Sequence, residues 1–224
     1  MPAFRQAKVT PTDQILKALG KPEELEPSDS RYRCFNTGGV EIEVGEFLYG
    51  LVRMLKPAEI LETGTHKGIS AAYMGLALKE NGEGHLTTIE FLEPNWAEST
   101  ALLHTLGLSG LLNIVLMDAA NYKTDLIFDI LFLDTEPQTR FAEFVKFYPN
   151  VKPGGLIMIH DLHPHMHQME VADHEFGWPY GKLPEEMRRL IHDGKIRLVH
   201  FRTPRGLTMF YKVAPDDYTP TTTK

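Results

Sequence analysis

The stretch AEILETGTHKGIS, residues 58–70, decides the fold of this chain. It opens with an apolar run of strand length and continues into a turn that contains Gly64 and Gly68. A helix is predicted next, from Ile69 to the Asn81-Gly82 pair that is typical of a helix end. The two glycines allow the backbone to turn tightly and to approach a ligand, and the helix N-terminus that follows favours an anion. Taken alone, this segment is also compatible with a plain structural turn.

Strands and helices alternate along the rest of the chain. Strands are predicted at 58–62, 85–90, 112–117, 128–133, 156–159, 195–201 and 207–213. Helices are predicted at 13–19, 44–55, 69–81, from Pro94 onward, 141–148 and 183–191, and a turn is predicted at 152–155. This alternation is typical of an α/β, Rossmann-like, doubly wound sheet of seven mostly parallel strands, covered by helices on both faces. The last two strands lie too close together in sequence for a crossover helix, so a final antiparallel strand is expected.

Composition divides the chain into three parts. Residues 1–40 contain four prolines and one short helical piece, so an N-terminal helical addition or cap is expected there. Residues 41–213 contain the predicted sheet and form the main domain. Residues 214–224 are rich in proline and threonine and are expected to be a mobile tail.

Composition and charge exclude several classes of protein. With 224 residues, of which 42% are hydrophobic and 24% charged, the chain has the balance of a globular protein. No apolar run approaches the ~20 residues that span a bilayer, and the N-terminus has no apolar segment typical of a secretory signal. The net charge of −7 disfavours nucleic acid as a partner, because phosphate binding needs clustered Lys and Arg. Cys34 is the single cysteine and cannot form an internal disulfide, so a reducing, cytoplasmic location is expected.

Acidic residues follow four successive predicted strands. They are Glu90, Asp118 (followed by Ala119), Asp134 and Asp161 (preceded by His160). In open parallel sheets, ligands bind outside the carboxyl ends of the strands, where the strand order reverses. A carboxylate at Glu90 can accept hydrogen bonds from both ribose hydroxyls, and one at Asp118 can reach an adenine amino group. This edge of the sheet therefore predicts a site for an adenosine-containing ligand.

The complete set of motifs is ordered along the sheet. It comprises Glu62-x-Gly64-Thr65-x-x-Gly68-x-Ser70, Glu90, Asp118-Ala119, Phe128-Asp129-x-x-Phe132-x-Asp134, Lys152-Pro153-Gly154-Gly155 and Asp161. In this order the motifs resemble the class I S-adenosylmethionine-dependent methyltransferases, over roughly residues 41–213. The first motif is most similar to the small-molecule O-methyltransferases of the catechol and caffeoyl-CoA type.

The resemblance implies where the methionine part of S-adenosylmethionine would lie. The residues concerned are Glu62, Gly64, Thr65, His66, Gly68 and Ser70. Glu62 and Gly64 would lie along the methionine. Ser70 would bind its carboxylate, with help from the backbone N–H groups of Thr65 and His66. His66 has a second interpretation, as a surface cap before the helix.

The resemblance also implies the position of the adenosine. Glu90 would hold the ribose hydroxyls, and Phe91 would lie against the adenine. Asp118 and Ala119 would sit at the adenine edge, and Asp134 would complete the cofactor site. The charges agree, because the sulfonium and ammonium of the cofactor suit an acidic strand edge and its carboxylate suits a helix N-terminus.

The resemblance departs from the family at the expected metal site. Metal-dependent members hold a divalent cation with an Asp after the fourth strand and an Asp-Asn pair after the fifth. Asp134 and Asp161 occupy the Asp positions, but Leu162 stands where the Asn is expected and cannot bind a metal. Whether the site holds a divalent metal therefore stays open: either the site is metal-free, or a neighbouring histidine or Glu136 supplies the third ligand. Histidine suits zinc, iron or nickel better than magnesium.

Histidines cluster directly after the fifth strand, where residues 160–167 read HDLHPHMH. This segment has three interpretations: a solvated polar loop over the site, a source of the general base, or a transition-metal site. The catalytic residues are expected to be His160, Asp161 and His163. Two carboxylates in one cleft need a cation, a proton or a histidine partner, so His160 or His163 would be that partner or the base.

The expected reaction is methyl transfer to an oxygen of a small-molecule acceptor, whose pocket residues 32–39 and the histidine-rich segment would enclose. One alternative is an NAD-dependent oxidoreductase, which is disfavoured because residues 64–68 lack the second glycine of Gly-x-Gly-x-x-Gly. Another is a protein that binds S-adenosylmethionine without transferring its methyl group. Besides the acceptor, the expected partner is a second copy of the chain in a homodimer, with neither nucleic acid nor membrane involved.

Overall fold

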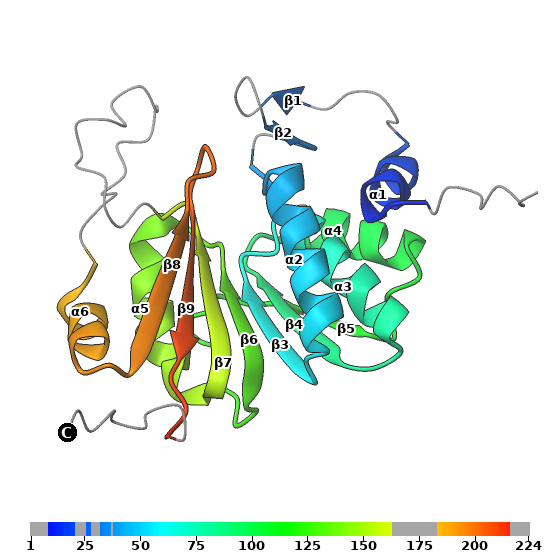
Figure 1. Cartoon of the computed structure of the whole chain (residues 1–224). Coiled ribbons are helices and arrows are strands. Elements are labelled where there is room, and N and C mark those ends of the chain that lie inside the picture. The colour runs from blue at the N-terminus through cyan, green and yellow to red at the C-terminus, as the bar shows by residue number, and fades with distance from the viewer. Residues whose placement is uncertain (1–8, 21–25, 28–31, 37, 163–182, 216–224) are drawn as a thin grey trace, which may run out of the picture.

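The computed structural model describes residues 9–20, 26–27, 32–36, 38–162 and 183–215 (Figure 1). Its main sheet has seven strands in the order β5-β4-β3-β6-β7-β9-β8. Their bounds are β3 Glu59–Thr63, β4 His85–Glu90, β5 Leu112–Leu116, β6 Phe128–Leu133, β7 Val151–His160, β8 Ile196–Phe201 and β9 Leu207–Lys212. The predicted α/β sheet of seven strands, most of them parallel, is confirmed.

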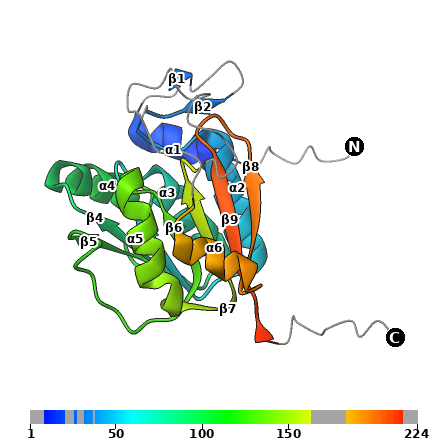
Figure 2. The ribbon, with the colours of Figure 1, turned by 90° about the vertical axis from the view of Figure 1, so that its left-hand side faces the viewer.

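Helices cover both faces of this sheet (Figures 1 and 2). Their bounds are α1 Pro11–Leu19, α2 Ile42–Leu55, α3 Ile69–Asn81, α4 Glu93–Thr105, α5 Pro137–Phe147 and α6 Glu185–His192, with a 3₁₀ turn at Tyr148–Asn150. Helices α1 to α4 contribute to one apolar core, and α5 and α6 contribute to a second core on the opposite face. Strand side chains alternate between the two, as Ile60 and Leu61 do. The fold is therefore doubly wound.

The strand order reverses at β3. This strand pairs in parallel with β4 on one side and with β6 on the other, although β6 follows β5 in the chain. Near the carboxyl end of β3, Thr63 is in register with Ile89 of β4 and Leu133 of β6. The chain thus continues from β3 towards β4 on one side of the sheet and from β6 towards β7 on the other. The residues after β3, β4 and β6 therefore meet at one edge.

The last two strands run as the short connection between them requires. β9 pairs antiparallel with β7 and with β8, so the expected final antiparallel strand is confirmed. The turn predicted at 152–155 is wrong, because β7 begins at Val151. Val151 pairs with Phe128 and Leu156 pairs with Ile130, so residues 152–155 form an irregularity inside the strand.

The N-terminal addition contains α1 and a ribbon of β1 Glu26–Pro27 and β2 Arg33–Cys34. Thr10 and Asp13 cap α1 reciprocally, and Thr12 on α1 lies 2.7 Å from the hydroxyl of Tyr73 on α3. These contacts attach the addition to the main domain, while the domain boundaries at 40 and 213 stay predictions. Residues 216–224 of the expected mobile tail lie outside the described residues. Within the described part of the chain, every helix is too short or too polar to cross a bilayer.

Candidate active site

The glycine-rich turn after β3 is held tightly against both neighbouring strands. The N–H groups of Gly64 and Thr65 both donate to the carbonyl of Ile89, at 2.9 and 3.1 Å. Gly64 has a φ of +85°, and a Cβ at this position would lie 2.3 Å from the carbonyl oxygen of Asp134. Gly68, with a φ of +82°, forms the N-cap of α3. The turn thus needs Gly64 both for its backbone conformation and for its contact with the end of β6.

Glu62 lies beneath this turn in a buried polar network. Its carboxylate accepts hydrogen bonds from the hydroxyls of Ser70 and Thr88, each at 2.5 Å, and Thr65 lies 2.5 Å from Thr88. Complete burial raises the pKa of Glu62 to about 7, although both hydroxyls act in the opposite direction. The Ser70 hydroxyl expected on the cofactor carboxylate is therefore engaged with Glu62 in this structure, and its assignment stays a prediction.

The raised pKa of Glu62 predicts a pH dependence of stability. A carboxyl whose pKa is about 7 in the folded protein and 4.5 as a model value favours folding below pH 4.5, and this contribution is lost as the pH rises through 7. We expect the free energy of unfolding to fall by about 3 kcal/mol over this interval on account of this group. Glu62→Gln should remove that fall when urea unfolding is measured from pH 4.5 to 8.

The matched control is Glu83→Gln, because Glu83 is an exposed acidic residue in the α3–β4 turn. The difference in unfolding free energy between this variant and the parent should be flat across the same interval. A flat difference for Glu62→Gln as well would show that Glu62 is ionised at neutral pH.

Glu90 ends β4 and faces the glycine-rich turn. Its carboxylate accepts hydrogen bonds from the backbone N–H groups of His66, at 2.6 Å, and of Phe91 and Leu92, at 3.0 and 2.8 Å. The side chain of Phe91 is 65% exposed directly beside it. A buried acceptor next to an exposed aromatic ring suits a ribose and its attached base, as the sequence predicted.

Asp118 and Ala119 follow β5 at the same edge. Asp118 is exposed and accepts a hydrogen bond from the N–H of Ala120, whereas Ala119 is buried. Lys146 on α5 fixes this loop by donating to the carbonyls of Ala119 and Ala120, both at 2.7 Å. Exposed apolar side chains also lie at the ends of β4 and β5, namely Phe91, Leu92, Leu116 and Met117. Their exposure leaves an apolar surface for an adenine, which supports but does not test the predicted assignment.

His66 lies in the left-handed backbone region, with a φ of +48°. Its ring packs against the N-terminal segment, since a Cβ at Gly38 would lie 2.6 Å from its Cε1 atom. Burial lowers the pKa of His66. His66 is therefore a half-buried contact between the turn and segment 38–41, rather than a simple surface cap.

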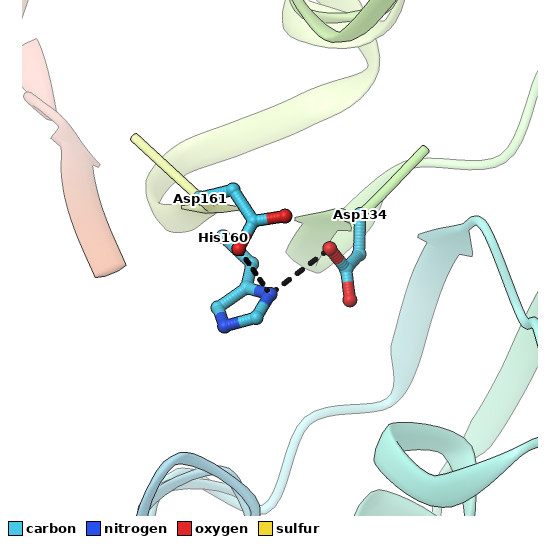
Figure 3. Close-up of side chains that lie close together, drawn as sticks. All are labelled: Asp134, His160 and Asp161. Atoms are coloured by element: carbon cyan, nitrogen blue, oxygen red, sulfur yellow. Dashed lines mark hydrogen bonds and ion pairs between the residues drawn. The ribbon is translucent and has the colours of Figure 1, made fainter. Parts of the chain in front are cut away.

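Asp134, His160 and Asp161 converge at the ends of β6 and β7 (Figure 3). His160 is fully buried, and its Nδ1 atom lies 3.0 Å from Asp134 Oδ1 and 3.4 Å from Asp161 Oδ1. Its Nε2 atom lies 2.8 Å from the carboxylate of Glu41, at the N-cap of α2. Because both ring nitrogens face carboxylates, His160 suits the role of cationic partner rather than that of base.

Two arginines complete this cluster. Arg140 on α5 has its Nη2 atom 3.2 Å from Asp134 Oδ1 and 3.1 Å from Asp161 Oδ2. Arg205, in the β8–β9 hairpin, places Nε and Nη2 at 2.7 and 2.8 Å from the two oxygens of Asp161. No sequence motif points to these two arginines or to Glu41, because they come from distant segments of the chain.

These charges shift one another's proton affinities. Burial alone would lower the pKa of His160, but the carboxylates of Asp161, Asp134 and Glu41 raise it to about 10. Burial alone would raise the pKa of Asp161, yet His160, Arg140 and Arg205 hold it well below its usual range. Glu41 is likewise kept ionised, because the contact with His160 outweighs its burial and lowers its pKa. In His160, Asp161 and Glu41 the opposite charges nearby thus outweigh burial and favour the charged form of each group.

The residues of this cluster do not suit the divalent metal that the sequence left open. The ligand atoms of Asp134, His160 and Asp161 lie within 4.8 Å of one another, close enough to surround an ion. However, the two aspartates already contact guanidinium groups, and both ring nitrogens of His160 face carboxylates, which favours a ring protonated on both nitrogens. Leu162 is buried in the apolar core beside α6, so it supplies no ligand. Glu136, at the N-cap of α5, is exposed, and His163 lies outside the described residues.

Comparison with known proteins agrees with this architecture. Residues 61–162 match a family model described as a methyltransferase domain. The matched segment holds the glycine-rich turn and every acidic strand end described above. Residues 61–162 are therefore similar to a methyltransferase domain, carried on a Rossmann-like fold. No curated protein sequence matches the chain.

Solved structures of similar fold include three methyltransferases. The O-methyltransferase TomG from Streptomyces achromogenes, in complex with S-adenosylmethionine, is 16% identical, with 95% of this chain and 93% of that chain covered and a TM-score of 0.61. The O-methyltransferase from Bacillus cereus, in complex with S-adenosylhomocysteine, is 17% identical, with 94% and 93% covered and a TM-score of 0.63. The S-adenosylhomocysteine-bound methyltransferase PaMTH1 from Podospora anserina is 15% identical, with 95% and 99% covered and a TM-score of 0.62. At these identities the likeness is one of fold.

Proposed function

We propose that this protein transfers the methyl group of S-adenosylmethionine to an oxygen of a small-molecule acceptor. The observation that carries the proposal is Glu90, a buried carboxylate that ends β4 against the glycine-rich turn and next to the exposed ring of Phe91. The match of residues 61–162 to a methyltransferase domain supports the reaction class. The O-methyltransferases of similar fold support oxygen as the acceptor atom.

The residues at the carboxyl edge of the sheet would bind and orient the cofactor, whose sulfonium supplies the transferable methyl group. Glu90 would accept hydrogen bonds from the ribose hydroxyls, and Phe91 would cover the adenine. Gly64 keeps the turn free of side chains where the methionine part would pass, beside Asp134. Catalysis of an in-line transfer then depends mainly on holding the acceptor oxygen in line with the methyl group.

Asp134 is the carboxylate best placed to act on the acceptor hydroxyl. Both of its described polar contacts, with Arg140 and His160, involve Oδ1. The other carboxylate oxygen of Asp134 carries no dashed line in Figure 3, and the side chain is 10% exposed. We assign proton acceptance to Asp134, whereas the sequence left the base open between His160 and His163, of which His163 lies outside the described residues.

The proposal predicts a specific loss of affinity in Glu90→Gln. This change removes the charge from the ribose acceptor and should cost about 1.5–3 kcal/mol in binding, roughly a 10- to 100-fold rise in the Kd for S-adenosylhomocysteine. Isothermal titration calorimetry measures this directly. The control is Glu98→Gln, because Glu98 is an exposed acidic residue on α4 that pairs with Lys67. Equal affinities of Glu90→Gln and the parent would disprove the ribose assignment.

The same calorimetry separates the alternative activities. Binding of NAD in place of S-adenosylhomocysteine would favour an oxidoreductase. Binding of S-adenosylhomocysteine without methyl transfer in an acceptor screen would favour a binding protein. The proposal also includes a cytoplasmic location, which the burial of Cys34 supports, and a homodimer, which sedimentation analysis would test.

A further inference from the structure

The charged cluster around His160 balances its own charge. Its carboxylates belong to Glu41, Asp134 and Asp161, and its cations are Arg140, His160 and Arg205. We propose that the two guanidinium groups and His160 are a fixed replacement for a divalent cation, and that removing one guanidinium converts the cluster into a metal site. This inference concerns the chain's own charges and does not depend on the methyl transfer proposed above.

Arg140 occupies the position that a bridging cation would take. One nitrogen atom, Nη2, lies 3.2 Å from Asp134 Oδ1 and 3.1 Å from Asp161 Oδ2, so it joins the two aspartates. The other nitrogens hold the guanidinium in place, because Nε donates to the carbonyl of Thr135 and Nη1 to that of His160. The side chain of Arg140 is only 5% exposed. A cation fixed in this way cannot leave to admit a metal ion.

Arg205 supplies the second fixed charge, from the other side of Asp161. Its guanidinium contacts both oxygens of Asp161, and Nη1 donates to the carbonyl of Gly39 at 2.8 Å. Its backbone N–H donates to Glu41. Arg205 therefore links the β8–β9 hairpin to the N-terminal segment through Gly39 and Glu41, and it also engages Asp161, a carboxylate that a metal would need.

The histidine contributes a charge rather than a lone pair. Metal ligation requires a ring nitrogen that carries no proton and faces the ion. In His160, Nδ1 lies 3.0 Å from Asp134 and Nε2 lies 2.8 Å from Glu41, and a hydrogen bond to each carboxylate requires a proton on each nitrogen. The distances among Asp134, His160 and Asp161 would admit an ion, but the protons and guanidinium groups exclude it.

The test is a titration of the metal-stripped protein with Mn²⁺, followed by calorimetry and by the electron paramagnetic resonance signal of free Mn²⁺. The parent protein should show no stoichiometric site. Arg205→Met and Arg140→Met should each gain one stoichiometric site, with an apparent affinity at least about tenfold above the weak, non-stoichiometric Mn²⁺ binding of the parent, because the aspartates lose a positive neighbour. Arg205→Lys keeps the charge and should resemble the parent. Arg53→Met removes an arginine that pairs with Glu80 elsewhere and should gain nothing.

Circular dichroism establishes that each variant is folded before it is titrated. A stoichiometric Mn²⁺ site in the parent would overturn the proposal, and this measurement decides it even where a variant fails to fold. The proposal would also be overturned if Arg205→Met and Arg140→Met both fold and neither binds Mn²⁺ stoichiometrically. S-adenosylhomocysteine binding by the parent is measured separately, so a failure of the proposed function can be distinguished from a failure of this inference.

Discussion

Asp161→Asn is expected to lower the free energy of unfolding by about 3–5 kcal/mol. Asp161 is 4% exposed and is in direct contact with Arg140, Arg205 and His160. Without its charge, buried Arg140 and His160 and half-buried Arg205 share only the carboxylates of Asp134 and Glu41. Removing one partner from a buried ionic cluster leaves uncompensated charge away from water, which is far more costly than losing a surface pair.

Asparagine isolates the effect of the charge from that of the backbone. Asp161 has a φ of +54°, a left-handed conformation that Asn tolerates better than most residues. The control is Glu185→Gln, which removes a carboxylate paired with Arg188 on the exposed face of α6 and should change stability by less than about 1 kcal/mol. Urea unfolding at pH 7 measures both variants. A loss below 1 kcal/mol in Asp161→Asn would contradict the description of the cluster as a buried, interdependent set.

Gly64→Ala should destabilise the protein by about 2–5 kcal/mol and abolish binding of S-adenosylhomocysteine. The new Cβ would lie 2.3 Å from the carbonyl oxygen of Asp134, and this neighbour is backbone that cannot rotate away. The φ of +85° adds a penalty of its own, about 1–2 kcal/mol for a residue with a Cβ. Relief of the clash would separate the glycine-rich turn from the end of β6, where the cofactor is proposed to lie.

A second glycine provides a control of opposite sign. Gly50 lies in the exposed interior of α2, and a Cβ there would meet no atom within 4 Å. Gly50→Ala should therefore stabilise the protein by about 0.5–1 kcal/mol, since alanine has less freedom to lose in a helix. Unfolding in urea and calorimetry with S-adenosylhomocysteine measure both variants. Normal cofactor affinity in Gly64→Ala would disprove the role of this turn.

Most of the fold could be predicted from local patterns. Apolar periodicity located every strand of the main sheet and the helices between them, and β4 and β6 have the predicted bounds. The failure at residues 152–155 has a local cause. Lys-Pro-Gly-Gly is typical of a turn, but the pairing of Val151 with Phe128 keeps this segment within the sheet as an irregularity near the start of β7.

The candidate site was only partly predictable. Glu62, Gly64 and Glu90 belong to motifs read within a few residues of a strand end, so the sequence was enough to locate them. Arg140, Arg205 and Glu41 have no such signal. Arg140 resembles any helical arginine, and Arg205 lies in a hairpin 44 residues from its partner Asp161.

The sequence by itself determined the order of strands and helices, the glycine-rich turn and the acidic strand ends, because periodicity and turn chemistry act over short distances along the chain. Only the tertiary structure decided what neutralises Asp134 and Asp161. Electrostatic attraction depends on distance in space, and the fold brings α2, α5, β7 and the β8–β9 hairpin together around these carboxylates. Because Leu162 stands where an asparagine was expected, the sequence did not identify the positive charge that neutralises the two aspartates. In the folded chain, Arg140, His160 and Arg205 supply that charge.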